Sequence, residues 1–430
     1  MARSPVAFAA VASRTGLRRV LAAYALYDFV EFSVWLAVIL WAFDVGDAYL
    51  AGLAALVQLV PAALVAPAIA SIGDRMPRGT ALVVAHGLVA LTCGLTAVAL
   101  WADAAVPVVI AAATTATTAI AVVRPIHFAS LPSLAASPDE LVSANSLSSV
   151  ADGTLRFLGP VAAGVIVAVL GFWQAFGLGT VVGLLAAALC ARLRLGSPVV
   201  EGEPPVGGLR AAVEGLVALR GDWGSLALLL AMTVDFVLGG ALDVLGISYA
   251  QDVLGVSPSG VGLVVGSMGI GALLGAFAGA PLSRRRRLAP VVVAGGVVDG
   301  LAFAAVALLG QLTPAVVMLA VAGTAGAVLL VSGRTLLQRA TDDRVLARVF
   351  AIQESTTLLG LAVGSMLAPV LIDLFSPRGA FIPLGVGCAL VALTGIVFVR
   401  RLDARSAYRP QETALLRGVP FLSVLPEYDI

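Results

Sequence analysis

The chain contains no lysine, and this absence removes one class of function. All 26 basic residues are arginine. The phosphate-binding loop of ATP-driven pumps, G-x-x-x-x-G-K-[ST], needs a lysine that reaches the terminal phosphates of the nucleotide. The sequence has no such loop, so energy for any transport would have to come from an ion gradient or from a partner protein.

Cysteine and charge are also scarce. The three cysteines, Cys93, Cys190 and Cys388, lie in separate apolar runs without metal-ligand spacing, so no structural disulfide or metal site is expected. Charged residues make up 12% of the chain, which is about half their share in a soluble globular domain. The chain is expected to lie mostly in lipid, and we predict no enzyme activity, no cofactor and no nucleic-acid partner.

Apolar stretches long enough to cross a bilayer recur along the whole sequence. A hydrocarbon core of about 30 Å needs ~20 apolar residues in a helix, and continuous apolar runs favour helices over a β-barrel. We therefore predict an all-α membrane protein with twelve transmembrane helices. Their expected ranges are 20–43, 48–72, 80–101, 107–129, 146–170, 172–192, 223–249, 259–281, 289–310, 314–335, 349–373 and 379–400.

A long polar interruption divides the chain in two. Residues 195–222 form a predicted cytoplasmic linker, with a short surface helix at 209–220. The linker separates an N-terminal six-helix half, 1–194, from a C-terminal half, 223–402, which a cytoplasmic tail, 403–430, follows. Arginines gather in every second loop, so the positive-inside rule predicts a multi-pass protein of the bacterial inner membrane with both termini in the cytoplasm.

Charged residues recur at matching places in the two halves. The matched pairs are Asp28 and Asp235, Arg124 and Arg334, and Asp152 and Glu354, at offsets of 207, 210 and 202 residues. Parallel six-helix halves related by an axis along the membrane normal are a transporter architecture, in which substrate binds between the halves near the midplane. The repeat therefore predicts two pseudo-symmetric bundles around a central site.

The second predicted cytoplasmic turn carries a family motif. Residues 70–78 read ASIGDRMPR and resemble the G-x-x-x-D-R-x-G-R loop of the major facilitator superfamily, with Asp74, Arg75 and Arg78 in the motif positions. Alanine and proline replace its two glycines. A weaker copy at 279–287 has serine in the position of the acid. The resemblance implies the twelve-helix fold of that superfamily and a cytoplasmic loop gate.

Three further arginines are assigned to this gate. Arg124 and Arg334 are predicted to end their helices at the cytoplasmic side, where they would reach the interface or close an inner gate. Asp74 is expected near the start of the eleventh predicted helix, beside Arg348, because a helix N-terminus attracts negative charge. This contact would hold the inner side closed.

A second resemblance concerns the direction of transport. Gly159, Pro160 and Gly164 are similar to the G-P-x-x-G-G segment that marks exporters of the superfamily, with Leu155 in place of its leading glycine. The arginine that many drug/proton antiporters carry early in helix 4 is absent from residues 109–118. The loop after that helix resembles the macrolide/siderophore exporter subgroup of drug:H⁺ antiporters, which implies efflux of a small amphiphilic molecule.

Acidic residues in predicted helix centres are candidates for proton coupling or for the substrate cavity, because such charges are costly in a membrane. Asp28 and Glu31 lie three residues apart and therefore on one helix face. Two carboxylates in one dry site do not both ionise readily, so one is expected to hold a proton. Asp235 and Asp243 are the candidates in the seventh helix. The alternative for each is an ion pair that serves packing alone.

A third group of charges is assigned to ion pairs between or within helices. Asp152 and Arg156 have i,i+4 spacing in the fifth helix, which favours a structural ion pair at the seam of the halves. Glu354 is expected to play the same part in the eleventh helix.

The tail gives a separate signal. Residues 412–430 resemble the opening helix and turn of a cyclic-nucleotide-binding domain, so a cyclic nucleotide is a predicted partner only if such a domain follows. The alternative is an amphipathic tail on the membrane surface.

Together these features predict a monomeric secondary transporter that exchanges a small amphiphilic molecule against protons by alternating access. The alternatives are a lysophospholipid flippase or importer of the same fold, and a non-transporting membrane sensor fused to a cyclic-nucleotide-binding domain.

Overall fold

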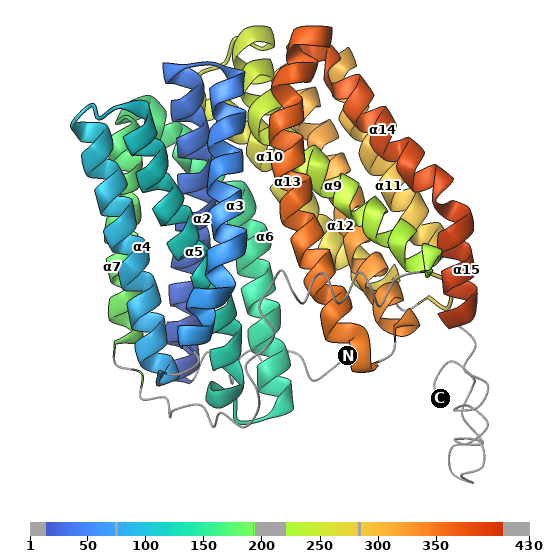
Figure 1. Cartoon of the computed structure of the whole chain (residues 1–430), viewed down its shortest axis with the longest axis horizontal. Helices are drawn as coiled ribbons and strands as arrows, with labels where there is room; N and C mark the ends of the chain where they lie inside the picture. The colour runs from blue at the N-terminus through green and yellow to red at the C-terminus, as the bar shows by residue number, and fades with distance from the viewer. Residues whose placement is uncertain are drawn as a thin grey trace.

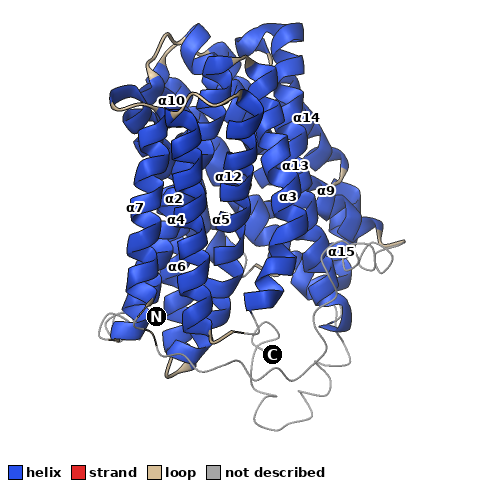
Figure 2. Cartoon of the chain, turned by 60° about the vertical axis from the view of Figure 1, so that its left-hand side comes forward, coloured by secondary structure: helices blue, strands red, loops and turns tan. Residues whose placement is uncertain are grey.

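A computed structural model of the chain describes residues 14–73, 76–191, 193, 221–282, 285–341 and 343–406. Within these ranges every regular element is helical, as Figure 2 shows. The predicted linker helix at 209–220 and the segment that resembles a nucleotide-binding domain, 412–430, lie outside the described residues.

The helices follow the predicted ranges closely. The N-terminal elements are α2 (Thr15–Val45), α3 (Ala48–Gly73), α4 (Arg78–Trp101), α5 (Val106–Leu134), α6 (Pro138–Val169) and α7 (Phe172–Cys190). The C-terminal elements are α9 (Trp223–Ser248) with a π-helical turn η1 (Tyr249–Val253), α10 (Pro258–Leu282), α11 (Ala289–Ala305) with a 3₁₀ turn η2 (Val306–Leu308), α12 (Leu312–Ala340), α13 (Asp343–Gly379), α14 (Phe381–Thr394) and α15 (Ile396–Ser406).

Most of these helices are membrane spans by length and composition. Among the described residues, ten helices are long and apolar enough to cross a bilayer, and α14 with α15, bent by 43°, forms an eleventh. The remaining predicted span is α3, whose described side chains form an apolar helix over Ala48–Ala62 and whose backbone runs on to Gly73 beside α2 (Figure 1). The chain is therefore a multi-pass membrane protein.

The helices form two bundles side by side. In Figure 1, α2 to α7 make one bundle and α9 to α15 the other. Between them α3 packs on α13 and α6 on α10. We call the end at which α2, α6, α9 and α13 begin the linker face, and the opposite end the far face.

Several helices are longer than the apolar pattern predicts, α5 and α6 among them. α5 continues to Leu134 although the predicted span ends at residue 129, and α6 begins at Pro138 although its predicted span begins at 146. Ser137 caps α6 because its hydroxyl accepts from the Glu140 N–H, and proline suits the first helical turn. These polar turns extend beyond the apolar pattern, which explains why hydropathy missed them.

Glycines bring α6 and α10 into backbone contact. A Cβ atom on Gly262 would lie 2.3 Å from the carbonyl oxygen of Pro160, and one on Gly266 would lie 2.8 Å from that of Phe157. A Cβ atom on Gly164, in α6, would likewise lie 2.3 Å from the carbonyl oxygen of Pro258. Small residues at such positions let membrane helices approach closely, so this seam between the bundles tolerates no added side chain.

Candidate functional site

Arg124 on α5 is the centre of a polar network in the N-terminal half. Its guanidinium lies 2.7 Å from a carboxylate oxygen of Glu31 on α2 and 2.8 Å from one of Asp152 on α6. The second oxygen of Asp152 lies 3.6 Å from Arg156, one turn along α6. Asp28 on α2 lies 3.7 Å from Arg124. The network therefore joins three helices through one cation.

One end of the network, at Asp28, is buried, and the other end, at Glu31 and Arg156, is partly exposed. The Asp28 side chain is fully buried, and neither of its oxygens has a hydrogen-bond partner among the described residues. The Glu31 side chain is 27% exposed and that of Arg156 is 45% exposed. A buried charge without hydrogen bonds is costly, so a carboxylate at Asp28 depends on the charge of Arg124 for compensation.

Aromatic rings cover the buried end of the network. The guanidinium of Arg124 lies 6.0 Å from the ring centroid of Tyr24 and 5.9 Å from that of Tyr27, within the range of cation–π attraction. Tyr24 also stacks on His127 at 3.9 Å, and the imidazole Nε2 is 2.9 Å from the Ser148 hydroxyl. Both tyrosine hydroxyls are buried and lack a described partner. Polar atoms able to bind a proton, water or substrate therefore gather beside Asp28.

The position of Arg124 differs from the prediction. Because α5 continues to Leu134, Arg124 does not end its helix but lies inside it, and its guanidinium reaches acids instead of the interface. The assignment of Arg124 to the loop gate is therefore corrected. Its repeat partner Arg334 on α12 is exposed and has no ion-pair partner among the described residues.

Asp235 on α9, the repeat partner of Asp28, has different surroundings. Its carboxyl group lies close to that of Asp299 on α11, because both carboxyl groups approach the same residue of α12, Gly326. The Cys388 thiol on α14 is 3.8 Å from the second oxygen of Asp299. Asp299 was not among the predicted site residues, although an acid in the middle of the apolar range 289–310 is the same signal that points to Asp28 and Asp235.

Asp243 joins the two halves. Its carboxylate accepts a hydrogen bond of 2.8 Å from the indole N–H of Trp35 on α2. Nearer the far face, the Tyr49 hydroxyl on α3 donates to Asp373 on α13 at 2.6 Å. Asp243 was a candidate for the cavity, but its observed contact connects the halves in their far part.

The loop motif is described only in part. Asp74 and Arg75 lie outside the described residues, as do the side chains of Arg348 and Glu354. Arg78 donates to the backbone carbonyl of Ala129 at the start of the last two turns of α5. The loop end of α4 is thus tied to α5.

The glycine–proline segment of α6 makes two helix contacts. The carbonyl of Gly159 accepts a hydrogen bond of 3.1 Å from Ser33 on α2. Pro160 and Gly164 lie against α10 through the backbone contacts given above. The segment therefore holds α6 between α2 of its own half and α10 of the other.

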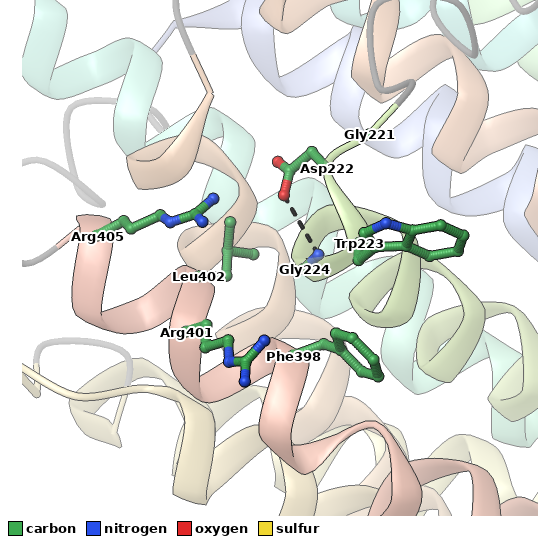
Figure 3. Close-up of a pocket in the computed structure, with 8 residues that line it drawn as sticks. All are labelled: Gly221, Asp222, Trp223, Gly224, Phe398, Arg401, Leu402 and Arg405. Carbon is green, nitrogen blue, oxygen red and sulfur yellow. Dashed lines mark hydrogen bonds between the residues drawn. The ribbon is translucent and has the colours of Figure 1, made fainter.

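A cavity of about 90 Å³ opens at the linker face, between the start of α9 and α15 (Figure 3). It is lined by Gly221, Asp222, Trp223, Gly224, Phe398, Arg401, Leu402 and Arg405. Asp222 caps α9 there: its carboxylate accepts a hydrogen bond of 3.2 Å from the Gly224 N–H. None of the lining residues belongs to the Arg124 network or to the Asp235–Asp299 pair.

Comparison with known proteins fits this arrangement. The model of the family described as Major Facilitator Superfamily matches residues 20–309 and, in an overlapping match, 224–425. The chain belongs to the major facilitator superfamily. It is therefore a secondary transporter and not an enzyme. No curated protein matches the chain.

Solved structures share the fold of this superfamily member. A bacterial homologue of the human lysosomal transporter Spinster, inward-facing and unoccupied, has 15% identity and a TM-score of 0.67 over 92% of this chain and 97% of that one. A peptide transporter in complex with alafosfalin has 12% identity and a TM-score of 0.72, over 91% and 95%. A peptide-transporter-family protein in complex with 5-aminolevulinic acid has 11% identity and a TM-score of 0.69, over 90% and 96%. At these identities the likeness concerns the fold.

Proposed function

We propose that the chain is a proton-coupled exporter of a small amphiphilic molecule in the bacterial inner membrane, with both termini in the cytoplasm. The observation that carries this proposal is the buried Asp28 carboxyl group, which has no hydrogen-bond partner in the part of the chain that the structure describes. It lies 3.7 Å from Arg124 beside the more exposed Glu31. The direction rests on the resemblance of Gly159, Pro160 and Gly164 to an exporter motif.

The network supports proton exchange by a simple competition. Arg124 faces three carboxyl groups, Asp28, Glu31 and Asp152, and only Asp152 also lies near a second cation, Arg156. Two cations do not neutralise three carboxylates. A proton bound at Asp28 or Glu31 lowers the negative charge of the site and lets it be occluded at less cost. A cationic substrate group that enters from the cytoplasm beside Glu31 would displace that proton, which leaves to the cytoplasm. A proton that binds from the outside would in turn displace the substrate to the outside.

The test is proton flux in liposomes that contain the purified protein and a pH-sensitive dye. Candidate drugs, siderophores and lysolipids are added in turn, with and without an imposed pH gradient. Asp28→Asn with Glu31→Gln should abolish pH-driven transport and leave a folded, monodisperse protein, because amides keep the shape of both side chains. Asp103→Asn, an exposed residue between α4 and α5, is the matched control.

Two results would contradict the proposal. Normal pH-driven transport by the double variant would place proton coupling at other residues. Substrate accumulation with the pH gradient reversed, or lysolipid transfer without proton flux, would favour an importer or a flippase of the same fold.

A further inference from the structure

The Asp235–Asp299 pair is a buried site in the C-terminal half. The Asp299 side chain is 0% exposed and that of Asp235 is 8% exposed. Both carboxyl groups lie against Gly326 on α12: a Cβ atom there would lie 2.2 Å from an oxygen of Asp235 and 3.7 Å from the carboxyl carbon of Asp299. The glycine thus leaves the space that the two acids occupy between α9, α11 and α12.

The proximity of these acids has a stoichiometric consequence. Two carboxylates side by side in a buried site disfavour each other's ionised form, so the pair is expected to hold a proton on one of its members. One oxygen of Asp299 is buried and has no hydrogen-bond partner among the described residues. No donor among those residues therefore offsets a negative charge at that oxygen.

The surrounding charges do not offer another means of neutralisation. On α14 the thiol of Cys388 donates weakly to Asp299 over 3.8 Å, and on α12 the acids lie against Gly326, which has no side chain. Arg156, on α6 of the other half, pairs with Asp152. No arginine among the described residues forms an ion pair with either acid, in contrast to the acids around Arg124.

We propose that Asp235 and Asp299 bind one shared proton and form a second proton-binding site of the transporter. The proton enters and leaves through Asp235, the less deeply buried member. On release the proton passes to water and leaves two neighbouring carboxylates, whose repulsion acts between α9 and α11. The role of this site in transport rests on the proposed proton coupling, whereas the proton itself does not.

Infrared difference spectroscopy on the reconstituted full chain tests the shared proton without any substrate. The wild-type protein should show the band of a protonated carboxyl group that shifts in D₂O and disappears on alkaline titration. Asp299→Asn and Asp235→Asn should each remove the contribution of the pair to this band, because an amide donates to the remaining carboxylate in place of the proton. Asp28→Asn with Glu31→Gln should retain this band, which separates the pair from the Arg124 network.

The outcomes of these experiments separate the shared proton from its role in transport. A band of unchanged size in both single variants overturns the proposal. Loss of the band together with loss of pH-driven transport in Asp299→Asn supports it, whereas loss of the band with unchanged transport makes the pair a packing contact and overturns its role. If Asp28→Asn with Glu31→Gln transports normally, the proposed coupling site fails, but the infrared assignment stands or falls by the Asp235 and Asp299 variants alone.

Discussion

The two halves of the molecule compensate for a buried carboxyl group in different ways. Asp28 and Asp235 occupy matching places in the repeat, in α2 and α9, and both are buried. Asp28 lies beside an arginine, whereas Asp235 lies beside a second acid, Asp299. The repeat therefore preserves where a carboxyl group sits but not what compensates for its burial. One half uses a fixed cation, and the other requires a mobile proton.

Removal of Arg124 should have the largest effect on the contrast between the two halves, because it takes away the cation that compensates the acids of the N-terminal half. Arg124→Ala leaves Glu31, Asp152 and Asp28 without their shared cation, and we expect a loss of ~2 kcal/mol in unfolding free energy, less than for a fully buried pair because the arginine side chain is 34% exposed. Arg334→Ala, the exposed repeat partner, should change stability by less than about 0.5 kcal/mol. Denaturation of both variants in detergent measures the difference. Equal losses would contradict the network.

A methyl group at Gly326 should disturb the acid pair in the other half. Gly326→Ala places a Cβ atom 2.2 Å from Asp235, and overpacking of this kind costs ~2 kcal/mol. Gly387→Ala on α14 is the control, because no atom lies within 4 Å of the added carbon. Thermal unfolding should separate the two variants, and an equally stable Gly326→Ala protein would mean that the pair does not fill that space.

The contact between the halves should matter less. Trp35→Phe keeps most of the aromatic volume but removes the hydrogen bond to Asp243, which is worth about 1 kcal/mol. Trp101→Phe, at the exposed end of α4, provides the comparison. Because the bond joins the halves near the far face, Trp35→Phe should also increase the rate at which a thiol reagent labels single cysteines introduced at the far face. Unchanged labelling would show that this contact does not hold the far side closed.

The smallest expected effect is at Glu140, whose negative charge is stabilised by a backbone N–H and by an arginine. The Ala136 N–H, and after it Arg14, lower the pKa of Glu140 below its ordinary value of 4.5. A depressed pKa contributes stability above pH 4.5 that is lost as pH falls through the folded-state value. Glu140→Gln should therefore unfold more easily than wild type near neutral pH, and the gap should narrow below that pH. A gap that does not vary with pH would contradict the assignment.

Most of the fold was predictable because the bilayer imposes a simple rule on sequence. Each predicted span corresponds to a helix, since every backbone polar group in lipid must be satisfied within its own segment. The errors lie where helices leave the apolar region, as in the last turns of α5 and the first turns of α6. There capping and polar contacts decide the ends, and hydropathy carries no information about them.

The site was predictable as a set of residues but not as a set of partners. Asp28, Glu31 and Asp152 stood out as acids in apolar helices, yet their common contact with Arg124 depends on how α2, α5 and α6 are rotated about their axes. The same rotation turns Asp235 toward Asp299 and leaves Arg334 exposed. Helix rotation follows from packing of the whole bundle, which single positions do not encode.

The glycine contact between α6 and α10 has a kinetic consequence for a transporter whose halves must move past each other. At Gly262 and Gly266 the surface that α10 presents to α6 is backbone, so no side chain of α10 there has to change rotamer when the helices shift. Freezing or exchanging a long side chain costs up to about 2 kcal/mol in entropy, and this seam avoids that cost in every cycle. The activation barrier for movement at the seam is then set by the polar contacts around it, so a change in the strength of those contacts changes the turnover rate directly.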